Sequence, residues 1–154
     1  MRLFLLVVFY TVIGTVFGQV PQDSLVIELR GKVENAQNDS VKVHYLIKLT
    51  KKVEKSNIGQ GRELIMETLG IINDIEIPND YFLKQKASIL DALGKYESRQ
   101  INYQNSLNFR LQALKIREAL KDSIEIAKSY HSMGMLFRYQ KEYDKSKFYF
   151  LKSL

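Results

Sequence analysis

Cysteine is absent from the 154-residue sequence, and histidine occurs only at His44 and His131. Without a thiol the chain can form no disulfide, thiolate zinc site or cysteine nucleophile. A catalytic or metal-binding cluster would need other partners to converge on one of two distant imidazoles, and no set of such partners is found. No nucleophile-elbow, zinc-protease or phosphate-loop motif occurs. The sequence therefore predicts a protein that is not an enzyme and that uses no metal or cofactor.

Proline and glycine are also scarce, with two and eight residues respectively. This scarcity, together with many Leu, Ile, Lys, Glu and Gln residues, favours helix throughout the chain. The one clear break is residues 71–80, IINDIEIPND, where Pro78 disfavours helix at the residue before it. The sequence thus predicts an all-α fold, and 154 residues suffice for one domain with a sizeable core.

Positive charge exceeds negative charge, giving a formal net charge of +6 that is spread along the chain. Such a distribution indicates an acidic partner only weakly. One face of a predicted helix is basic and lies opposite an apolar stripe, which is typical of a nucleic-acid or lipid surface but also of an ordinary solvated helix face. We favour the solvated face and predict no nucleic-acid partner. The basic residues are Lys48, Lys51, Lys52 and Lys55.

The first 18 residues have the pattern of a secretory signal peptide. Arg2 precedes an apolar run over 3–17, and Val16 and Gly18 occupy the small-residue places of a cleavage site. We expect a mature protein that begins at Gln19, lies outside the cytoplasm (periplasmic or secreted) and does not insert into the membrane. The alternative is an uncleaved anchor over residues 3–18, although a spanning helix needs about 20 apolar residues.

Residues 127–154 have the spacing of two helices joined by a tight turn. The first half places two aromatics, an apolar residue and a glycine on one face, and the second half places a small residue between two aromatics. Because glycine inside a helix costs about 1 kcal/mol relative to alanine, it predicts a close approach of the two helices. The positions are Tyr130, Met133, Gly134, Phe137, Tyr143, Ser146 and Phe150.

A second copy of this pattern lies 40 residues earlier. Gly94 and Ser106 correspond to Gly134 and Ser146, so both copies keep the glycine and the small residue twelve positions apart. A period of this size is typical of stacked helical hairpins. The earlier copy has Leu90 and Glu97 where the later one has Tyr130 and Phe137. We divide the chain into a signal peptide (1–18), an N-terminal segment with an entry helix (19–39), a degenerate hairpin (40–73) and two repeats (80–120 and 123–154).

Within the degenerate hairpin, residues 57–61, NIGQG, are predicted to form a turn between two helices. Gly59 and Gly61 form a G-x-G, but no strand precedes it and no further phosphate-loop residue follows. Gly61 lies twelve positions after Leu49 and takes the small-residue place of this hairpin.

The spacing of both copies resembles the tetratricopeptide repeat, whose pattern is W-x2-L-G-x2-Y followed by A-x3-F. The resemblance implies antiparallel helical hairpins stacked as a short right-handed α-solenoid. The whole arrangement is similar to the N-terminal sensor region of bacterial extracytoplasmic tetratricopeptide proteins. In that family the repeats often precede a membrane helix and a cytoplasmic histidine kinase or helix-turn-helix regulator.

The resemblance implies a binding module for protein or peptide, of the kind that serves as the sensor input of a signalling protein, with a groove lined by five positions of each first helix. The alternative for these positions is plain solvent exposure. Four of them are positive and one is negative, so we expect a local charge of about plus three and a weak preference for acidic segments. The asparagines of a carboxylate clamp are missing. The groove positions are Ser88, Asp91, Lys95, Ser98, Arg99, Lys128, His131, Met135, Arg138 and Tyr139.

The last predicted helix, over 143–154, is apolar around much of its circumference. Because repeat arrays need polar ends for solubility, we expect this helix to pair with another chain, or the 154 residues to be a piece of a longer array. The alternative function is a structural spacer or dimerisation segment of a larger membrane-linked histidine kinase or transcriptional regulator.

Overall fold

The computed structural model describes residues 23–76 and 78–154, and within them every regular element is an α-helix. The all-α prediction is therefore confirmed. The predicted signal peptide lies outside the described residues. No helix in the described part is long and apolar enough to cross a membrane. The helices are α1 (Ser24–Glu34), α2 (Asp39–Val53), α3 (Ile58–Asn73), α4 (Asp80–Arg99), α5 (Tyr103–Ala119), α6 (Ser123–Tyr139) and α7 (Tyr143–Lys152).

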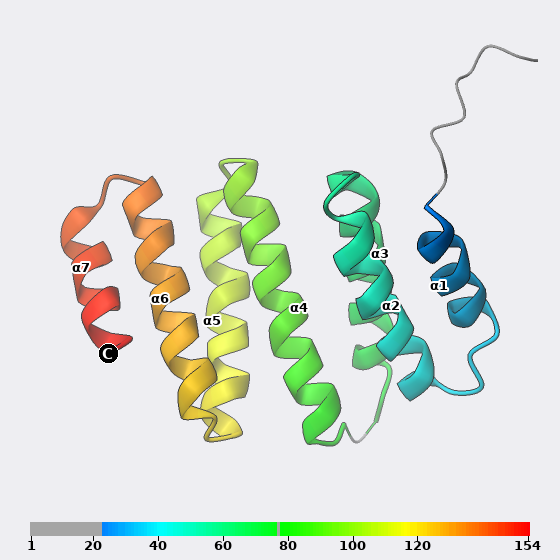
Figure 1. Cartoon of the computed structure of the whole chain (residues 1–154). Coiled ribbons are helices and arrows are strands. Elements are labelled where there is room, and N and C mark those ends of the chain that lie inside the picture. The colour runs from blue at the N-terminus through cyan, green and yellow to red at the C-terminus, as the bar shows by residue number, and fades with distance from the viewer. Residues whose placement is uncertain (1–22, 77) are drawn as a thin grey trace, which may run out of the picture.

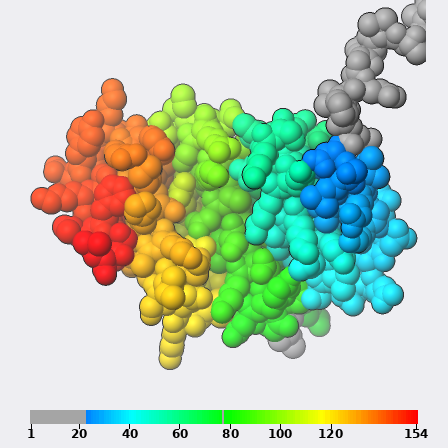
Figure 2. Space-filling model, viewed as in Figure 1, coloured from blue at the N-terminus to red at the C-terminus, as the bar shows by residue number. Residues whose placement is uncertain are grey.

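The helices lie in chain order, and each packs mainly against its neighbours in sequence (Figure 1). In the space-filling view the colour changes steadily from blue at one end of an elongated body to red at the other (Figure 2). The strongest packing is within the pair α4–α5, followed by the pairs α6–α7 and α2–α3. Helix α5 also packs against α6, so it lies between α4 and α6.

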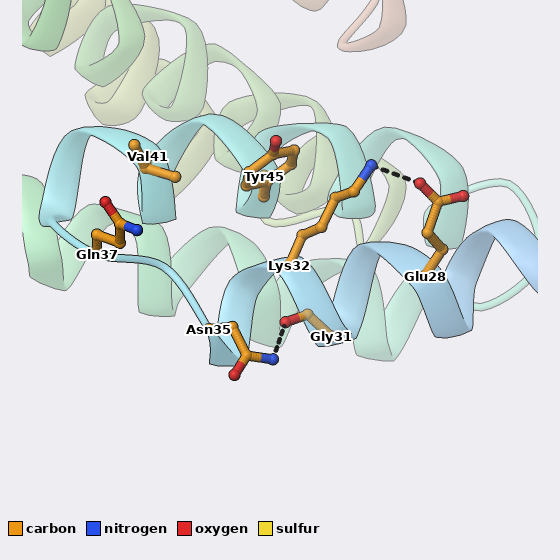
Figure 3. A pocket seen from close by; sticks show the side chains of 7 residues that line it. All are labelled: Glu28, Gly31, Lys32, Asn35, Gln37, Val41 and Tyr45. Carbon is orange, nitrogen blue, oxygen red and sulfur yellow. Dashed lines mark hydrogen bonds and ion pairs between the residues drawn. The ribbon is translucent and has the colours of Figure 1, made fainter.

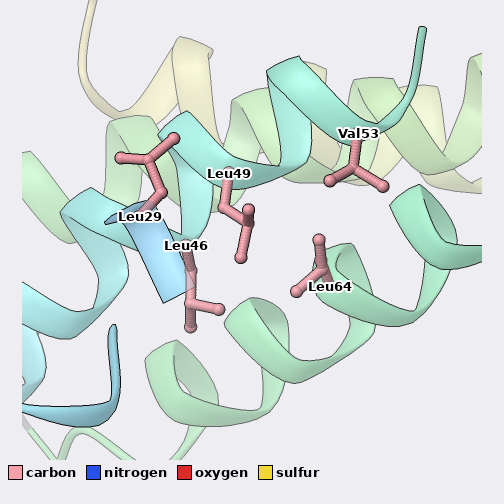
Figure 4. Packing of buried hydrophobic residues seen from close by; sticks show 5 residues of the cluster. All are labelled: Leu29, Leu46, Leu49, Val53 and Leu64. Carbon is pink, nitrogen blue, oxygen red and sulfur yellow. The ribbon is translucent and has the colours of Figure 1, made fainter. Parts of the chain in front are cut away.

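The core is a series of apolar clusters, each shared by consecutive helices. The first joins α1, α2 and α3 through five buried residues (Figure 4): Leu29, Leu46, Leu49, Val53 and Leu64. The next joins α2 and α3 to α4 through Val43, Ile65, Ile72, Ile89 and Leu93. A third, between α4 and α5, consists of Ala87, Leu90 and Ala113. Clusters of buried apolar residues thus extend along the row of helices from α1 to α5.

Asparagine and aspartate side chains cap the first turns of several helices. Asn79 accepts a hydrogen bond of 3.2 Å from the Phe82 amide, and Asp122 accepts one of 3.2 Å from the Glu125 amide. Such caps satisfy amides that have no partner within the helix. Asn57 does the same for Gln60. The predicted turn over 57–61 is therefore wrong, because the cap starts α3 at Ile58 despite Gly59 and Gly61.

The last three connections between helices share one conformation. Ile101, Lys121 and Lys141 have φ values of 64°, 55° and 62°, in the left-handed region. After each, an amide reaches back to a carbonyl in the last turn of the preceding helix, as from Asn102 to Glu97 at 2.9 Å. This pattern of bonds is that of a Schellman helix ending. The three connections recur every twenty residues, which gives α4 to α7 equal spacing.

The close contact predicted in the last hairpin is present. Ser146 is buried, and its hydroxyl donates to the Gly134 carbonyl oxygen. A Cβ at Gly134 would lie 2.7 Å from the Phe150 ring, which explains the glycine. The expectation that Tyr143 faces inward is wrong, since it is 66% exposed at the start of α7. Tyr149 instead stacks on Phe137, with ring centroids 5.2 Å apart.

Candidate functional site

The ten predicted groove positions lie on α4 and α6, the two helices that pack against α5. We call them the α4–α6 surface. Seven of the side chains are exposed, while Asp91, Ser98 and Met135 are partly buried. Ser98 shares a hydrogen bond of 2.7 Å with Ser106 of α5. The surface therefore combines exposed charge with a few side chains that contact the underlying helix.

Two carboxylates that the sequence did not assign to this surface neutralise part of its charge. Glu54, at the end of α2, forms ion pairs with Lys95 at 3.8 Å and Arg99 at 3.6 Å. Glu125 of α6 lies 2.5 Å from Lys128. With Asp91, three carboxylates oppose the four predicted cations. The expected surplus of three positive charges thus falls to one among these residues.

Arg117 of α5 joins α4 to α6 beneath this surface. Its Nη1 donates hydrogen bonds to Asp91 Oδ2 at 2.5 Å and to Ser129 Oγ at 2.6 Å, and its Nη2 lies 3.3 Å from a Glu125 carboxylate oxygen. The side chain is 6% exposed. Charge-assisted hydrogen bonds of this kind are the strong ones. Arg117 therefore fixes the relative positions of α4, α5 and α6.

A second arginine of α5, Arg110, is also buried, seven residues before Arg117. Its Nε donates to Ser106 Oγ at 3.3 Å. Burial lowers the pKa of Arg110, while the nearby Asp91 and Tyr139 raise it. Burial also raises the pKa of Asp91, and the positive charges of Arg117 and Arg110 oppose this shift only in part. These two arginines restore the positive surplus that Glu54 and Glu125 remove.

Sequence analysis missed both arginines. Charged residues are almost never fully buried unless paired, so a lysine or arginine on a predicted helix is ordinarily assigned to solvent. The available signal was the 40-residue correspondence, since Arg110 takes the place of the inward aromatic Phe150. Glu97, at the place of Phe137, is buried in the same way and accepts a hydrogen bond of 3.0 Å from Asn102.

His131 faces α7 as well as solvent. Its ring lies 5.1 Å from that of Phe150, and both line an open hollow of about 410 Å³ at the end of the row of helices. The prediction that His131 shares one surface with Lys95 and Arg99 has no support in these contacts. The hollow is also lined by Tyr143, Ser146, Lys147, Leu151, Ser153 and Leu154.

A second hollow, of about 440 Å³, lies at the opposite end of the row, between α1 and α2 (Figure 3). Lys32 pairs with Glu28 at 2.5 Å across its edge, and Asn35 donates to the Gly31 carbonyl oxygen at 2.8 Å. Tyr45 forms one wall. Its polar groups thus bond mainly to one another, so the hollow offers fewer free contacts than the α4–α6 surface.

The basic stripe on α2 is partly engaged with neighbouring groups. Lys52 pairs with Asp23 at 2.6 Å, and Lys48 lies over the Tyr45 ring at 5.8 Å. Lys51 and Lys55 are exposed. The stripe thus contains two lysines that contact other side chains and two that face solvent.

Among the described residues, no group of three or more histidines, aspartates and glutamates is placed to hold a metal ion. Comparison of the sequence with protein-family models and with curated proteins gave no match.

Proposed function

We propose that this chain is a non-enzymatic module of the tetratricopeptide-repeat type that binds protein or peptide through its α4–α6 surface. The supporting observation is that three consecutive helices, α4, α5 and α6, contribute cations at or beneath this surface. Lys95 and Arg99 come from α4, Arg110 and Arg117 from α5, and Arg138 from α6. Regularly stacked hairpins expose such extended surfaces.

The chemistry of the surface favours an acidic segment as ligand. Lys128 brings the cations to six, against the three carboxylates of Asp91, Glu54 and Glu125. Arg138 and the exposed Tyr139 ring, which lie 6.0 Å apart, offer apolar contact beside the charge. Exposed ion pairs are worth only about 0.2 to 1 kcal/mol. Binding is therefore expected to be about micromolar or weaker and to decrease with salt.

The test is selection of peptides from an acidic library by the protein from Gln19 onward, followed by repeat measurements with Arg99→Glu/Arg138→Glu. These residues come from different helices, so the double variant should lose binding while its helix content stays the same. The matched control is Arg30→Glu/Lys115→Glu, which changes the net charge equally at exposed positions of α1 and α5. Equal binding by parent and Arg99→Glu/Arg138→Glu would overturn the proposal and make the α2 lysine stripe the next surface to test.

The exposed apolar residues of α7 favour a second candidate, a dimerisation or spacer segment of a larger signalling protein. Leu151 is 60% exposed, and it lines the hollow with Phe150. Self-association that depends on concentration in light scattering, and that Leu151→Glu removes, would support this role. A monomer at every concentration would count against it.

We further propose that the protein works outside the cytoplasm, because residues 1–18 have the pattern of a signal peptide. Expression in a secretion-competent bacterium should yield soluble protein beginning at Gln19. Recovery from the membrane with Met1 intact would favour the alternative anchor.

A further inference from the structure

Arg110 occupies a place that an aromatic ring occupies in the next hairpin. Phe150 lies four residues after Ser146, whose hydroxyl bonds to Gly134, and Arg110 lies four residues after Ser106, whose hydroxyl bonds to Gly94 at 2.7 Å. A Cβ at Gly94 would lie 3.0 Å from Arg110 Cγ. The two hairpins thus share one geometry, and the first places a charged group where the second has a ring.

The charge of Arg110 is only partly compensated by the described residues. The residue is 8% exposed. Within residues 23–76 and 78–154, its side chain makes one hydrogen bond, from Nε to Ser106, and forms no ion pair with a carboxylate. The terminal nitrogens donate to no described group, yet neither is fully sealed from solvent. Since burying a charge without a partner is costly, these nitrogens are free donors at the edge of a buried site.

A shared hydroxyl places Arg110 beside the α4–α6 surface, because Ser106 Oγ bonds both to Arg110 Nε at 3.3 Å and to Ser98 Oγ at 2.7 Å. Asp91 and Tyr139, from α4 and α6, both stabilise its charge electrostatically. Both belong to the α4–α6 surface. Arg117 is paired with two carboxylates, Asp91 at 2.5 Å and Glu125 at 3.3 Å. Among the described residues, Arg110 is therefore the buried arginine of this junction that has no ion pair of its own.

We propose that Arg110 is the anion anchor of the α4–α6 surface and binds a carboxylate of the bound peptide, from an acidic side chain or from the C-terminus. This inference rests on the proposed peptide-binding function. A guanidinium presents paired donors that match a carboxylate, which makes arginine well suited to such an anchor. The exposed ring of Tyr139 lies beside the site, and Arg117 holds Asp91 in place next to it.

The competing arrangement is an internal pair between Arg110 and Asp91. Asp91 Oδ1 is buried and accepts no hydrogen bond within the described residues. If Arg110 served only this oxygen, Asp91→Asn would leave peptide affinity unaltered. If Arg110 anchors the ligand, removing the competing negative charge should tighten the binding of an acidic peptide.

The decisive variant is Arg110→Phe, which installs the residue found at the equivalent place in α7. It should fold, because Gly94 provides the same room as Gly134, and replacing a buried charge by an apolar group is often neutral or stabilising. The probe is the acidic peptide selected by the parent protein. We expect about a tenfold to hundredfold loss of affinity, with unchanged helix content and equal or higher resistance to urea.

Two modified peptides distinguish the sources of the carboxylate. One has its acidic side chains changed to the amides, and the other has an amidated C-terminus. The peptide that lacks the anchored carboxylate should bind parent and Arg110→Phe equally weakly. Should Arg110→Phe fail to fold, Arg110→Met, which keeps the length without the charge, takes its place.

The outcomes separate the two proposals. A parent that binds no peptide overturns both. If Arg99→Glu/Arg138→Glu abolishes binding but Arg110→Phe binds as well as the parent, the anchor is refuted and the surface stands. An Arg110→Phe variant that is more stable than the parent yet binds at least tenfold more weakly supports the anchor, because a purely structural arginine would not move stability and affinity in opposite directions.

Discussion

The Ser146 hydroxyl donates a hydrogen bond of 2.9 Å to the carbonyl oxygen of Gly134, twelve residues earlier and on the facing helix. Ser106 makes the same bond to Gly94 at 2.7 Å. The glycine–serine pair therefore joins the two helices of each hairpin at one point. It also sets the position of the side chain four residues after the serine, which is Phe150 in one hairpin and Arg110 in the other.

The first prediction concerns this contact. Gly134→Ala should destabilise the protein by about 1 to 3 kcal/mol, because the added methyl group would overpack against the Phe150 ring. Gly70→Ala is the control, since a Cβ at Gly70 in α3 meets nothing within 4 Å. It should stabilise by up to about 1 kcal/mol, the helix preference of alanine over glycine. Urea unfolding of both variants is the measurement, and equal effects of the same sign would refute the close contact.

A second prediction concerns the left-handed turn at Ile101. A β-branched residue at a φ of 64° is strained, by about 1 to 2 kcal/mol for a residue with a Cβ. Ile101→Gly should raise the free energy of unfolding by about 0.5 to 1 kcal/mol, after the entropic cost of glycine. Ile124, which is equally exposed at 71% but lies in α6, is the matched control. Ile124→Gly should destabilise, and a gain from both variants would contradict the turn geometry.

The third prediction is a pH dependence that comes from Asp91. Burial raises its pKa above the ordinary value of 3.8, so the folded protein favours the protonated acid. Stability from this group is therefore fully present below 3.8 and is lost as the pH rises through the raised pKa. Acidification should thus stabilise the parent relative to Asp91→Asn, which lacks the titrating group.

Urea unfolding of the parent and Asp91→Asn over a series of pH values tests this sign. Other carboxylates titrate in both proteins, so their effects cancel in the difference between the two free energies of unfolding. If the parent instead loses stability relative to Asp91→Asn on acidification, the ion pair with Arg117 at 2.5 Å outweighs burial.

Much of the helical layout could be predicted from local rules. The scarcity of proline and glycine predicted helix throughout, and the Gly–Ser spacing of twelve predicted the close contact that Gly134 and Ser146 make. Residues 57–61 were assigned wrongly because glycine indicates a turn when read alone, whereas the Asn57 cap and the burial of Gly61 against Glu54 favour helix.

The site was less predictable than the helices because its chemistry depends on tertiary contacts. Glu54 pairs with Lys95 and Arg99 only because the end of α2 lies near α4. Arg117 is buried between Asp91 of α4 and Ser129 of α6, and Arg110 lies against Gly94 of α4. Helical periodicity assigns an arginine to solvent, because a pattern within one helix does not show whether a carboxylate on another helix will pair with it.

Calorimetric titration tests most directly whether the α4–α6 surface binds acidic peptide segments. The full mature chain is titrated with a selected acidic peptide and with the same peptide carrying glutamine and asparagine in place of glutamate and aspartate, at low and at high salt. We predict about micromolar binding of the acidic peptide at low salt, clear weakening at high salt and little binding of the neutral peptide. Equal affinities for the two peptides, or an affinity unaffected by salt, would contradict the claim.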